Sequence, residues 1–388
     1  MNRTPEPSLR IALVMKQLAS RRMSAEHARI LQRELLGHGH VVRRFGAWGK
    51  PRPDSGSKVT NPLHVHEADP ELADFDPQAI VVYDAATPAA LTGARQAARL
   101  NVPLFLIQEG LPHETPHIER WFRRFGHNVW GALLRRNCTR IIALDPVAKD
   151  SLIRRGYSPE AIEVVPPGID LAQYRPGLWS HLPTQHGIRG RMLLHIGKIN
   201  FGLGLEELVA AFAQTVGRRR DWALVLAGEG EAQSTLQSQV TRLGIGSQVH
   251  FLSEPSEEEL PGLLGSSTLF AAPRGDAGAG DLIERRALAC GLPVLSSERP
   301  GVRHFLEDDG CGRLAPAGDA EAWAEMIQLA ASSPERRRRW SLRAREIAEQ
   351  CFAWPHIGNR IAAILGEMIL DHAEAQREPD GFPKPEPR

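Results

Sequence analysis

Two glycine-containing segments in the second half of the chain carry residues that suit a phosphate group. Lys198 follows an apolar run and Gly197; a glycine lets the backbone come close to a ligand, and a cation neutralises phosphate. Gly278-Ala-Gly280 precedes a helical pattern that starts at Asp281, and the unpaired amides of a helix start can face a phosphate. The same residues are also typical of a surface lysine and of an ordinary helix start with Asp281 as its N-cap, so both interpretations stay open.

Glu109, in the first half, closely follows the apolar run Pro103–Ile107, and a carboxylate can act as a base or a hydroxyl acceptor. A carboxylate at the end of a strand is also often a simple structural acceptor. His113 lies just downstream and could supply an imidazole, although a lone histidine is more often structural. Neither residue decides between function and structure by itself.

Short apolar runs that alternate with helical patterns would position these residues. The expected strands cover 10–15, 79–83, 103–107, 140–144 and 162–165 in the first half, with another that starts at 40, and 192–196, 222–227, 249–252, 269–272 and 293–296 in the second. Such alternation predicts parallel sheets with crossover helices. The sequence therefore predicts an α/β fold of two doubly wound, Rossmann-like domains that face each other across a cleft, with ligands beyond the carboxyl ends of the strands.

The polar segment Gly177–Gly190 has no apolar period and is the expected domain boundary. It separates a first domain over 1–178 from a second domain over 190–350. An amphipathic helical pattern follows at 352–370. The polar residues 374–388 include several prolines, and we expect them to be a disordered tail.

The composition argues against some classes of function. Among the 388 residues, 47 basic and 46 acidic ones leave a net charge of +1, which gives no case for a nucleic-acid partner. The four cysteines are widely separated and form no Cys-x-x-Cys pair, so we expect neither a metal site nor a redox motif. No apolar run reaches the roughly 18 residues of a membrane span, and we expect a cytoplasmic protein.

The segment 118–136 combines apolar residues at helical spacing with surrounding arginines. A basic amphipathic helix can lie on an anionic membrane surface, which would allow peripheral contact with the inner face of a membrane. The alternative is a core helix of the first domain with a solvated basic face.

A series of short motifs runs through roughly residues 140–355. They are, in order, Val164–Asp170 with Tyr174–Pro176, His195–Lys198, Leu224–Gly230, Val249–Leu252 with Glu258–Pro261, Ala287–Val294, Gly310–Asp319 and Phe352–Trp354. In this order they resemble the family 4 glycosyltransferases, which are retaining enzymes of the GT-B fold that take sugar from nucleotide sugars. The resemblance implies a nucleotide-diphosphate sugar as substrate, no metal or other cofactor, and a last helix, over 351–373, that returns to the first domain. It leaves the acceptor unknown.

The resemblance also implies donor-binding residues in two segments. Gly197 and Lys198 stand where the family has a glycine and a cationic phosphate ligand. The segment before the Cys-Gly-x-Pro exit of a helix supplies the other candidates, which are Asp276, Gly278, Gly280 and Arg286.

Several family positions are altered in this segment and before it. A second family cation falls on Leu203, which cannot neutralise phosphate, and two family glutamates fall on Gly278 and Arg286. Asp276 and Glu284 keep the family spacing of eight but are shifted by two residues, which turns a helical side chain by about 200°. Glu284 is a candidate catalytic carboxylate if the turn is rebuilt, and otherwise a solvated carboxylate near arginines. Arg286 could partly replace the cation lost at Leu203.

The first half departs from the family as well. The family's glycine pair before an alanine and a glutamate falls on Met23-Ser24, so Ser24 is expected on the acceptor side together with His113. The family's histidine falls at or near Glu109, which makes Glu109 the other candidate catalytic residue.

Three functions remain compatible with these residues. The first is a glycosyltransferase that moves a sugar from a nucleotide-diphosphate sugar to an unknown acceptor, such as a glycan, a lipid or a small molecule of the cell envelope. The second is a catalytically inactive, glycosyltransferase-like binding or scaffold protein. The third is a sugar-nucleotide epimerase, which needs a dense set of histidine and acidic residues that the sequence lacks. We expect the first.

Overall fold

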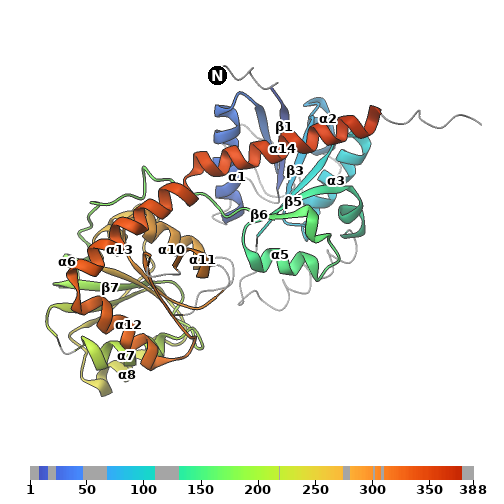
Figure 1. The fold of residues 1–388 in the computed structure, drawn as a ribbon. Coiled ribbons are helices and arrows are strands. Elements are labelled where there is room, and N and C mark those ends of the chain that lie inside the picture. The colour runs from blue at the N-terminus through green and yellow to red at the C-terminus, as the bar shows by residue number, and fades with distance from the viewer. Residues whose placement is uncertain are drawn as a thin grey trace, which may run out of the picture. The chain divides into compact units, whose positions relative to one another are not determined.

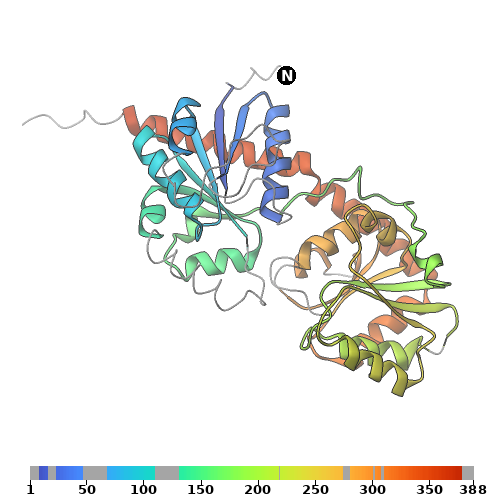
Figure 2. The same ribbon diagram turned by 180° about the vertical axis from the view of Figure 1, so that it is seen from behind.

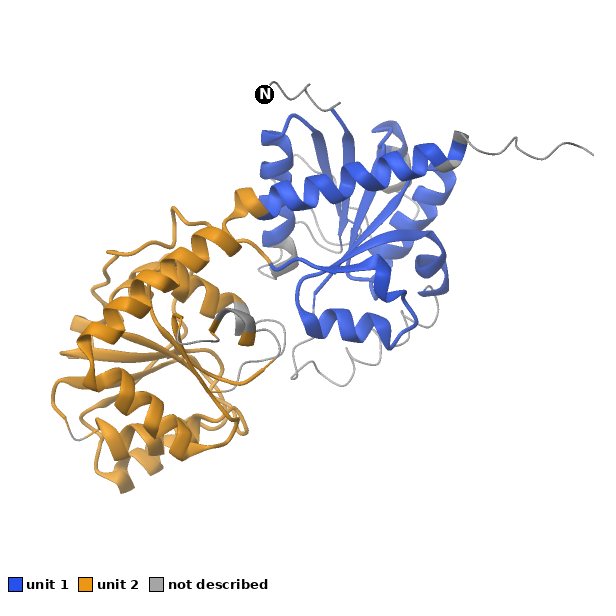
Figure 3. Ribbon diagram, in the orientation of Figure 1, with its two compact units in different colours: residues 1–166, 357–388 blue, residues 167–356 orange. Residues whose placement is uncertain are grey.

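The computed structural model describes residues 8–15, 23–46, 68–109, 131–217, 219–273, 280–299, 302–306 and 310–377. The chain divides into two compact units, the first formed by Met1–Pro166 and Ile357–Arg388 and the second by Pro167–His356 (Figure 3). This division falls earlier in the chain than the polar segment Gly177–Gly190.

The first unit contains a six-stranded sheet in the order β2-β1-β3-β4-β5-β6, and its strand pairs are parallel. Its strands are β1 (Arg10–Met15), β2 (Val41–Gly46), β3 (Ala79–Tyr83), β4 (Leu104–Gln108), β5 (Cys138–Ala143) and β6 (Ile162–Val164). The helices described between these strands are α1 (Met23–Gly37), α2 (Ala68–Asp74), α3 (Pro88–Leu100) and α5 (Pro146–Ile153), with a short 3-10 helix at Pro159–Ala161.

The second unit contains another six-stranded parallel sheet, in the order β12-β11-β10-β7-β8-β9. Its strands are β7 (Arg191–Ile196), β8 (Trp222–Ala227), β9 (Val249–Leu252), β10 (Leu269–Ala272), β11 (Val294–Ser297) and β12 (Gly312–Ala315). Its helices are α6 (Leu182–Gln185), α7 (Leu205–Thr215), α8 (Gln233–Leu243), α9 (Leu260–Gly265), α10 (Gly280–Ala289), α11 (Arg303–Leu306), α12 (Ala320–Ser332) and α13 (Pro334–Ile347), followed by a π-helical turn at Ala348–Phe352. The prediction of two doubly wound parallel sheets is confirmed.

Helices cover both faces of each sheet (Figures 1 and 2). In the second unit, Leu194 and Val294 pack on one face with residues of α9, α10 and α13. Leu193 and Leu295 pack on the other face with residues of α7, α8 and α12. Neighbouring residues of a strand point to opposite faces, so a strand covered on both sides must be apolar throughout. This requirement explains why the strands of the sequence appeared as continuous apolar runs.

The last helix, α14 (Trp354–Arg377), begins in the second unit and continues in the first (Figure 3). Within the first unit, Arg360 forms an ion pair with Glu163 at 2.7 Å, and His372 Nε2 lies 3.0 Å from the main-chain oxygen of Asn101. Five apolar side chains on this part of α14 are buried: Ile357, Ile361, Ile364, Leu365 and Met368. The chain therefore enters the second unit once and returns to the first through this helix.

Candidate functional site

The order of strands in the second unit marks one place where a ligand should bind. From β7 the chain continues to β8 and β9 on one side of the sheet, and then crosses to β10, β11 and β12 on the other. Ligands of open parallel sheets bind outside the carboxyl ends of the strands at such a switch point. The carboxyl ends of β7 and β10 are Ile196 and Ala272, so the residues that follow them form the candidate site.

Two glycines bring the loops after β7 and β8 into backbone contact. The amide of Gly197 donates to the carbonyl oxygen of Ala227 at 3.0 Å, and Gly197 and Gly228 have φ angles of 152° and 153°. A Cβ atom on Gly228 would overlap the carbonyl oxygen of Gly197. Glycine is therefore needed at Gly228 both for its dihedral angle and for this close approach.

Lys198 and Leu203 lie in the same loop and differ in burial. Lys198 is exposed and follows Gly197 directly, as a phosphate ligand at this edge would require. Leu203 is half-buried and packs against the apolar cluster that includes α7. Leu203 thus packs with the apolar side chains of this unit, and the phosphate role of Lys198 stays a prediction.

His195 connects the two strands of the switch point. Its ring is buried and its Nδ1 lies 3.0 Å from the carbonyl oxygen of Ala271 in β10. Because a carbonyl oxygen can only accept, Nδ1 carries the proton. Burial lowers the pKa of His195, so the ring is neutral. In the sequence, His195 stands out only as part of a motif, because no pattern marks a histidine that bonds to a neighbouring strand.

Glu284, on α10, is buried in a polar network. Its Oε1 accepts a hydrogen bond from Ser296 Oγ at 2.9 Å, and its Oε2 forms an ion pair with Arg299. Arg299 Nη1 in turn donates to Ser296 Oγ at 2.9 Å. The alternative of a solvated Glu284 is wrong, since its side chain is only 1% exposed. A nearby arginine does pair with it, as that alternative had allowed, and this arginine comes from the loop after β11.

Arg286 points to different partners from Glu284, as a shift of two residues on a helix predicts. Arg286 is buried, and its Nη1 lies 3.3 Å from Glu257 Oε1. Its guanidinium also lies over the ring of Tyr174, with 5.0 Å between Cζ and the ring centroid. Arg286 therefore links α10 to the segment after β6 and to the loop after β9, and its donor-binding role stays a prediction.

Some predicted site residues lie outside the described part of the chain. These are Asp276, Gly278 and His113, together with residues 118–130 of the expected basic helix. Gly280 begins α10. Ser24 lies at the start of α1, and its side chain is not among those described.

Glu109 directly follows β4 at the carboxyl edge of the first sheet. It is half-buried, and its main-chain oxygen accepts from Gln108 Nε2 at 2.9 Å. The switch point of this sheet lies between β1 and β3, one strand away from β4. Glu109 is thus near the expected acceptor edge, and its catalytic role stays a prediction.

Two further polar residues of this edge were not predicted from the sequence. His27 Nδ1 lies 3.0 Å from the hydroxyl of Tyr83, the last residue of β3, and burial lowers the pKa of His27 to about 3. Asp84 follows Tyr83 and has a φ angle of 61°, which lies in the left-handed region. Such conformations are uncommon outside glycine and often occur at functional sites.

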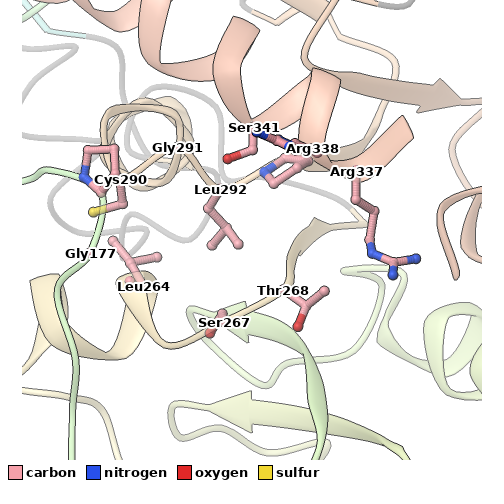
Figure 4. Close-up of a pocket in the computed structure, with 13 residues that line it drawn as sticks. Gly177, Leu264, Ser267, Thr268, Cys290, Gly291, Leu292, Arg337, Arg338 and Ser341 are labelled. Carbon is pink, nitrogen blue, oxygen red and sulfur yellow. The ribbon is translucent and has the colours of Figure 1, made fainter. Parts of the chain in front are cut away.

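A cavity of about 320 Å³ lies at the opposite, amino-terminal edge of the second sheet. Ser267 and Thr268 precede β10 on one side of it, and Arg338 and Ser341 of α13 lie on the other (Figure 4). Since Thr268 and Gly197 lie at opposite ends of neighbouring strands, this cavity is distinct from the switch-point site.

Among the described residues, no group of three or more histidine, cysteine, aspartate or glutamate side chains could hold a metal ion. Within the same part of the chain, no helix has the length and apolar character needed to cross a membrane.

Two family models match the chain one after the other. The model for Glycosyltransferase Family 4 matches residues 22–173, and the model for Glycosyl transferases group 1 matches residues 184–347. Together they cover the greater part of both units.

Curated relatives carry names of glycosyltransferases. The chain is 29% identical over 242 residues to a D-inositol 3-phosphate glycosyltransferase of Saccharomonospora viridis. This match covers 59% of the present chain and 56% of the relative. It is 26% identical over 342 residues to a GDP-mannose-dependent alpha-(1-6)-phosphatidylinositol monomannoside mannosyltransferase of Mycolicibacterium smegmatis. That match covers 84% of the present chain and 83% of the relative. The chain spans about half the length of the first of these relatives.

Solved structures share the fold at low identity. Anabaena Alr3699/HepE in complex with UDP superposes with a TM-score of 0.70 at 20% identity, over 92% of this chain and 100% of that one. A glycosyltransferase from Rickettsia africae superposes with a TM-score of 0.72 at 13% identity, over 93% and 98%. The resemblance drawn from the sequence motifs is confirmed: the chain belongs to the GT-B glycosyltransferases that these two family models describe.

Proposed function

We propose that the protein is a glycosyltransferase whose second unit binds a nucleotide-diphosphate sugar at the carboxyl edge of β7 and β10. The observation that carries this proposal is the Gly197–Lys198 loop at the switch point of the second sheet. A backbone packed closely through Gly228 fixes the loop, and an exposed cation follows its first residue. These are the two features that a diphosphate needs from a protein.

Lys198 would act mainly on the leaving group. As the bond between sugar and diphosphate breaks, negative charge grows on the diphosphate, and a cation fixed beforehand stabilises that charge. Asp276, Gly278 and Gly280 would complete the donor site from the segment that leads into α10, with no metal ion needed as cofactor. Glu109 would serve the acceptor as a base or hydroxyl acceptor.

The names of similar proteins suggest which donor nucleotides and acceptors to test first. The Anabaena protein was solved with UDP and with UDP-glucose, and the mycobacterial relative is named for GDP-mannose and a phosphatidylinositol mannoside. UDP and GDP sugars are therefore the first donors to test, and polyol phosphates and lipid-linked glycans of the cell envelope the first acceptors. Contact of the segment 118–136 with a membrane would suit a lipid-linked acceptor.

The test has two steps. UDP, GDP and ADP are each added to the protein, and the melting temperature is recorded, because a ligand of the native state must raise it. The matching nucleotide sugars are then incubated with the protein and candidate acceptors, and released nucleoside diphosphate is measured. The proposal fails if none of the three diphosphates raises the melting temperature.

The second candidate function is an inactive binding or scaffold protein of the same fold. It is prompted by two features of the second unit: Leu203 packs against the core where the resemblance implies a cation, and the Glu284 carboxylate is held by Arg299. A protein that binds a nucleotide but releases no diphosphate from any of the nucleotide sugars would support this candidate.

A further inference from the structure

We propose that Arg299 is a phosphate-binding residue of the donor site and that Glu284 positions its guanidinium. This inference rests on the proposed function and adds to it a residue for which the sequence motifs provide no role. It also gives Glu284 a task other than direct contact with a sugar.

The position of Arg299 in the fold is the first argument. Arg299 follows β11 by two residues, at the same edge of the sheet as the Gly197–Lys198 loop. Its Nη1 lies 2.9 Å from Ser296 Oγ, which in turn lies 3.4 Å from the carbonyl oxygen of Ala272. One hydroxyl group thus separates the guanidinium from the last residue of β10, a strand of the switch point.

The difference in exposure within the ion pair is the second argument. The Glu284 side chain is 1% exposed and that of Arg299 is 16% exposed. The carboxylate is therefore the inner member of the pair, and Arg299 is the member whose side chain reaches solvent. A ribose or sugar hydroxyl would have to displace Arg299 to reach Glu284.

The geometry of the guanidinium is the third argument. Arginine offers five N–H donors in a rigid plane, and a planar fork binds phosphate well. Glu284 and Ser296 hold this plane at two of its nitrogens, so little rotational freedom is lost when a phosphate binds. A lysine at this position could not be held in the same way.

The charge at this edge is the fourth argument. The loop after β7 supplies Lys198 but has Leu203, a side chain packed against the core, at the position of the second family cation. Arg299 supplies a second cationic group from the loop after β11 instead. The donor site would then hold the diphosphate between cations from two different loops.

The test compares nucleotides with their nucleosides in calorimetric titrations, using UDP with uridine and GDP with guanosine. Arg299→Met should weaken binding of the preferred diphosphate at least tenfold and leave the nucleoside affinity within twofold. Arg299→Lys should restore only part of the loss, because it keeps the charge and lacks the fork. Arg343→Met is the matched control, since it removes an arginine of the same unit whose ion pair is exposed, and it should bind the diphosphate like the wild type.

Glu284→Asp tests the positioning role. It keeps the charge but shortens the side chain, so the guanidinium is drawn out of place, and the diphosphate affinity should fall about threefold while the nucleoside affinity stays. If the carboxylate of Glu284 has only a structural role, Glu284→Asp would lower the melting temperature without this selective loss of diphosphate affinity. If Arg299→Met does not fold, the uncharged pair Glu284→Gln with Arg299→Met replaces it, and the same loss of diphosphate affinity is expected.

The outcomes separate the two proposals. A wild-type protein that binds a diphosphate, with an Arg299→Met variant that binds it equally well or loses diphosphate and nucleoside alike, overturns the role of Arg299 alone. A wild-type protein that binds none of the diphosphates overturns the proposed function, and the role of Arg299 with it.

Discussion

Glu284 of α10 and Arg299 of the loop after β11 form an ion pair in which the carboxylate is buried and the arginine side chain is 16% exposed. Ser296 Oγ bridges the two side chains. Removing one member of a buried pair leaves the other charge uncompensated, which costs more free energy than the pair itself contributes. The carboxyl edge of the second sheet therefore depends on both residues.

Glu284→Gln should lower the free energy of unfolding by about 3 kcal/mol, because Arg299 would lose the buried counter-charge of Glu284. Urea denaturation measures the change. Glu346→Gln is the control, since its ion pair with Arg343 is exposed, and it should change the free energy by less than about 0.5 kcal/mol. Equal free energies of unfolding for the two variants would show that the pair of Glu284 and Arg299 stabilises the fold no more than an exposed ion pair does. If the protein is active, Glu284→Gln should also reduce turnover at least about tenfold.

Gly228→Ala should destabilise the second unit by about 2 kcal/mol, because its Cβ would overlap the carbonyl oxygen of Gly197. The φ angle of 153° at Gly228 adds to the strain. The variant should also bind nucleoside diphosphate more weakly, since the loop that begins at Gly197 must move. Gly246→Ala is the matched control because a Cβ there meets no atom within 4 Å. Equal melting temperatures for the two variants would contradict the packing argument.

Lys198→Ala should weaken binding of the nucleoside diphosphate and make the remaining affinity less sensitive to salt, since an exposed charge–charge attraction is removed. Titrations at low and at high ionic strength measure both effects. Unchanged affinity at low salt would exclude Lys198 as a phosphate ligand.

The stability of the first unit should depend on pH through His27. Burial lowers the pKa of His27 from 6.5 to about 3, so below pH 6.5 the unfolded chain takes up a proton that the folded chain does not. This contribution to stability is complete above pH 6.5 and is lost as the pH falls from 6.5 toward 3. Unfolding measured between pH 7 and pH 4.5 should therefore show a steeper loss for the wild type than for His27→Gln. The same slope for both proteins would rule out a neutral, buried His27.

The strands could be predicted from the sequence because both faces of each sheet are covered. Ala79–Tyr83, for example, is buried at every residue and was an uninterrupted apolar run. β12 was not predicted, because only the first and last of its four residues are buried and it includes a glycine and an arginine.

The site could be predicted only in part, because its polar contacts join segments that are distant in the sequence. Helix geometry predicts that the side chains of Glu284 and Arg286 point in different directions from α10. Their partners in the structure differ accordingly. The pairing of Glu284 with Arg299 depends on how α10 packs against the end of β11. The bond between His195 and Ala271 likewise depends on the neighbouring positions of β7 and β10.

The central claim is that a nucleotide binds at the carboxyl edge of β7 and β10. Hydrogen exchange of the backbone amides, measured with and without the nucleoside diphosphate that raises the melting temperature, tests it most directly. The account predicts slower exchange in residues 195–204 and 226–231, which include the ends of β7 and β8 and the loops that follow them. Slower exchange confined to residues 264–268 and 337–341, which line the cavity at the opposite edge, would contradict it.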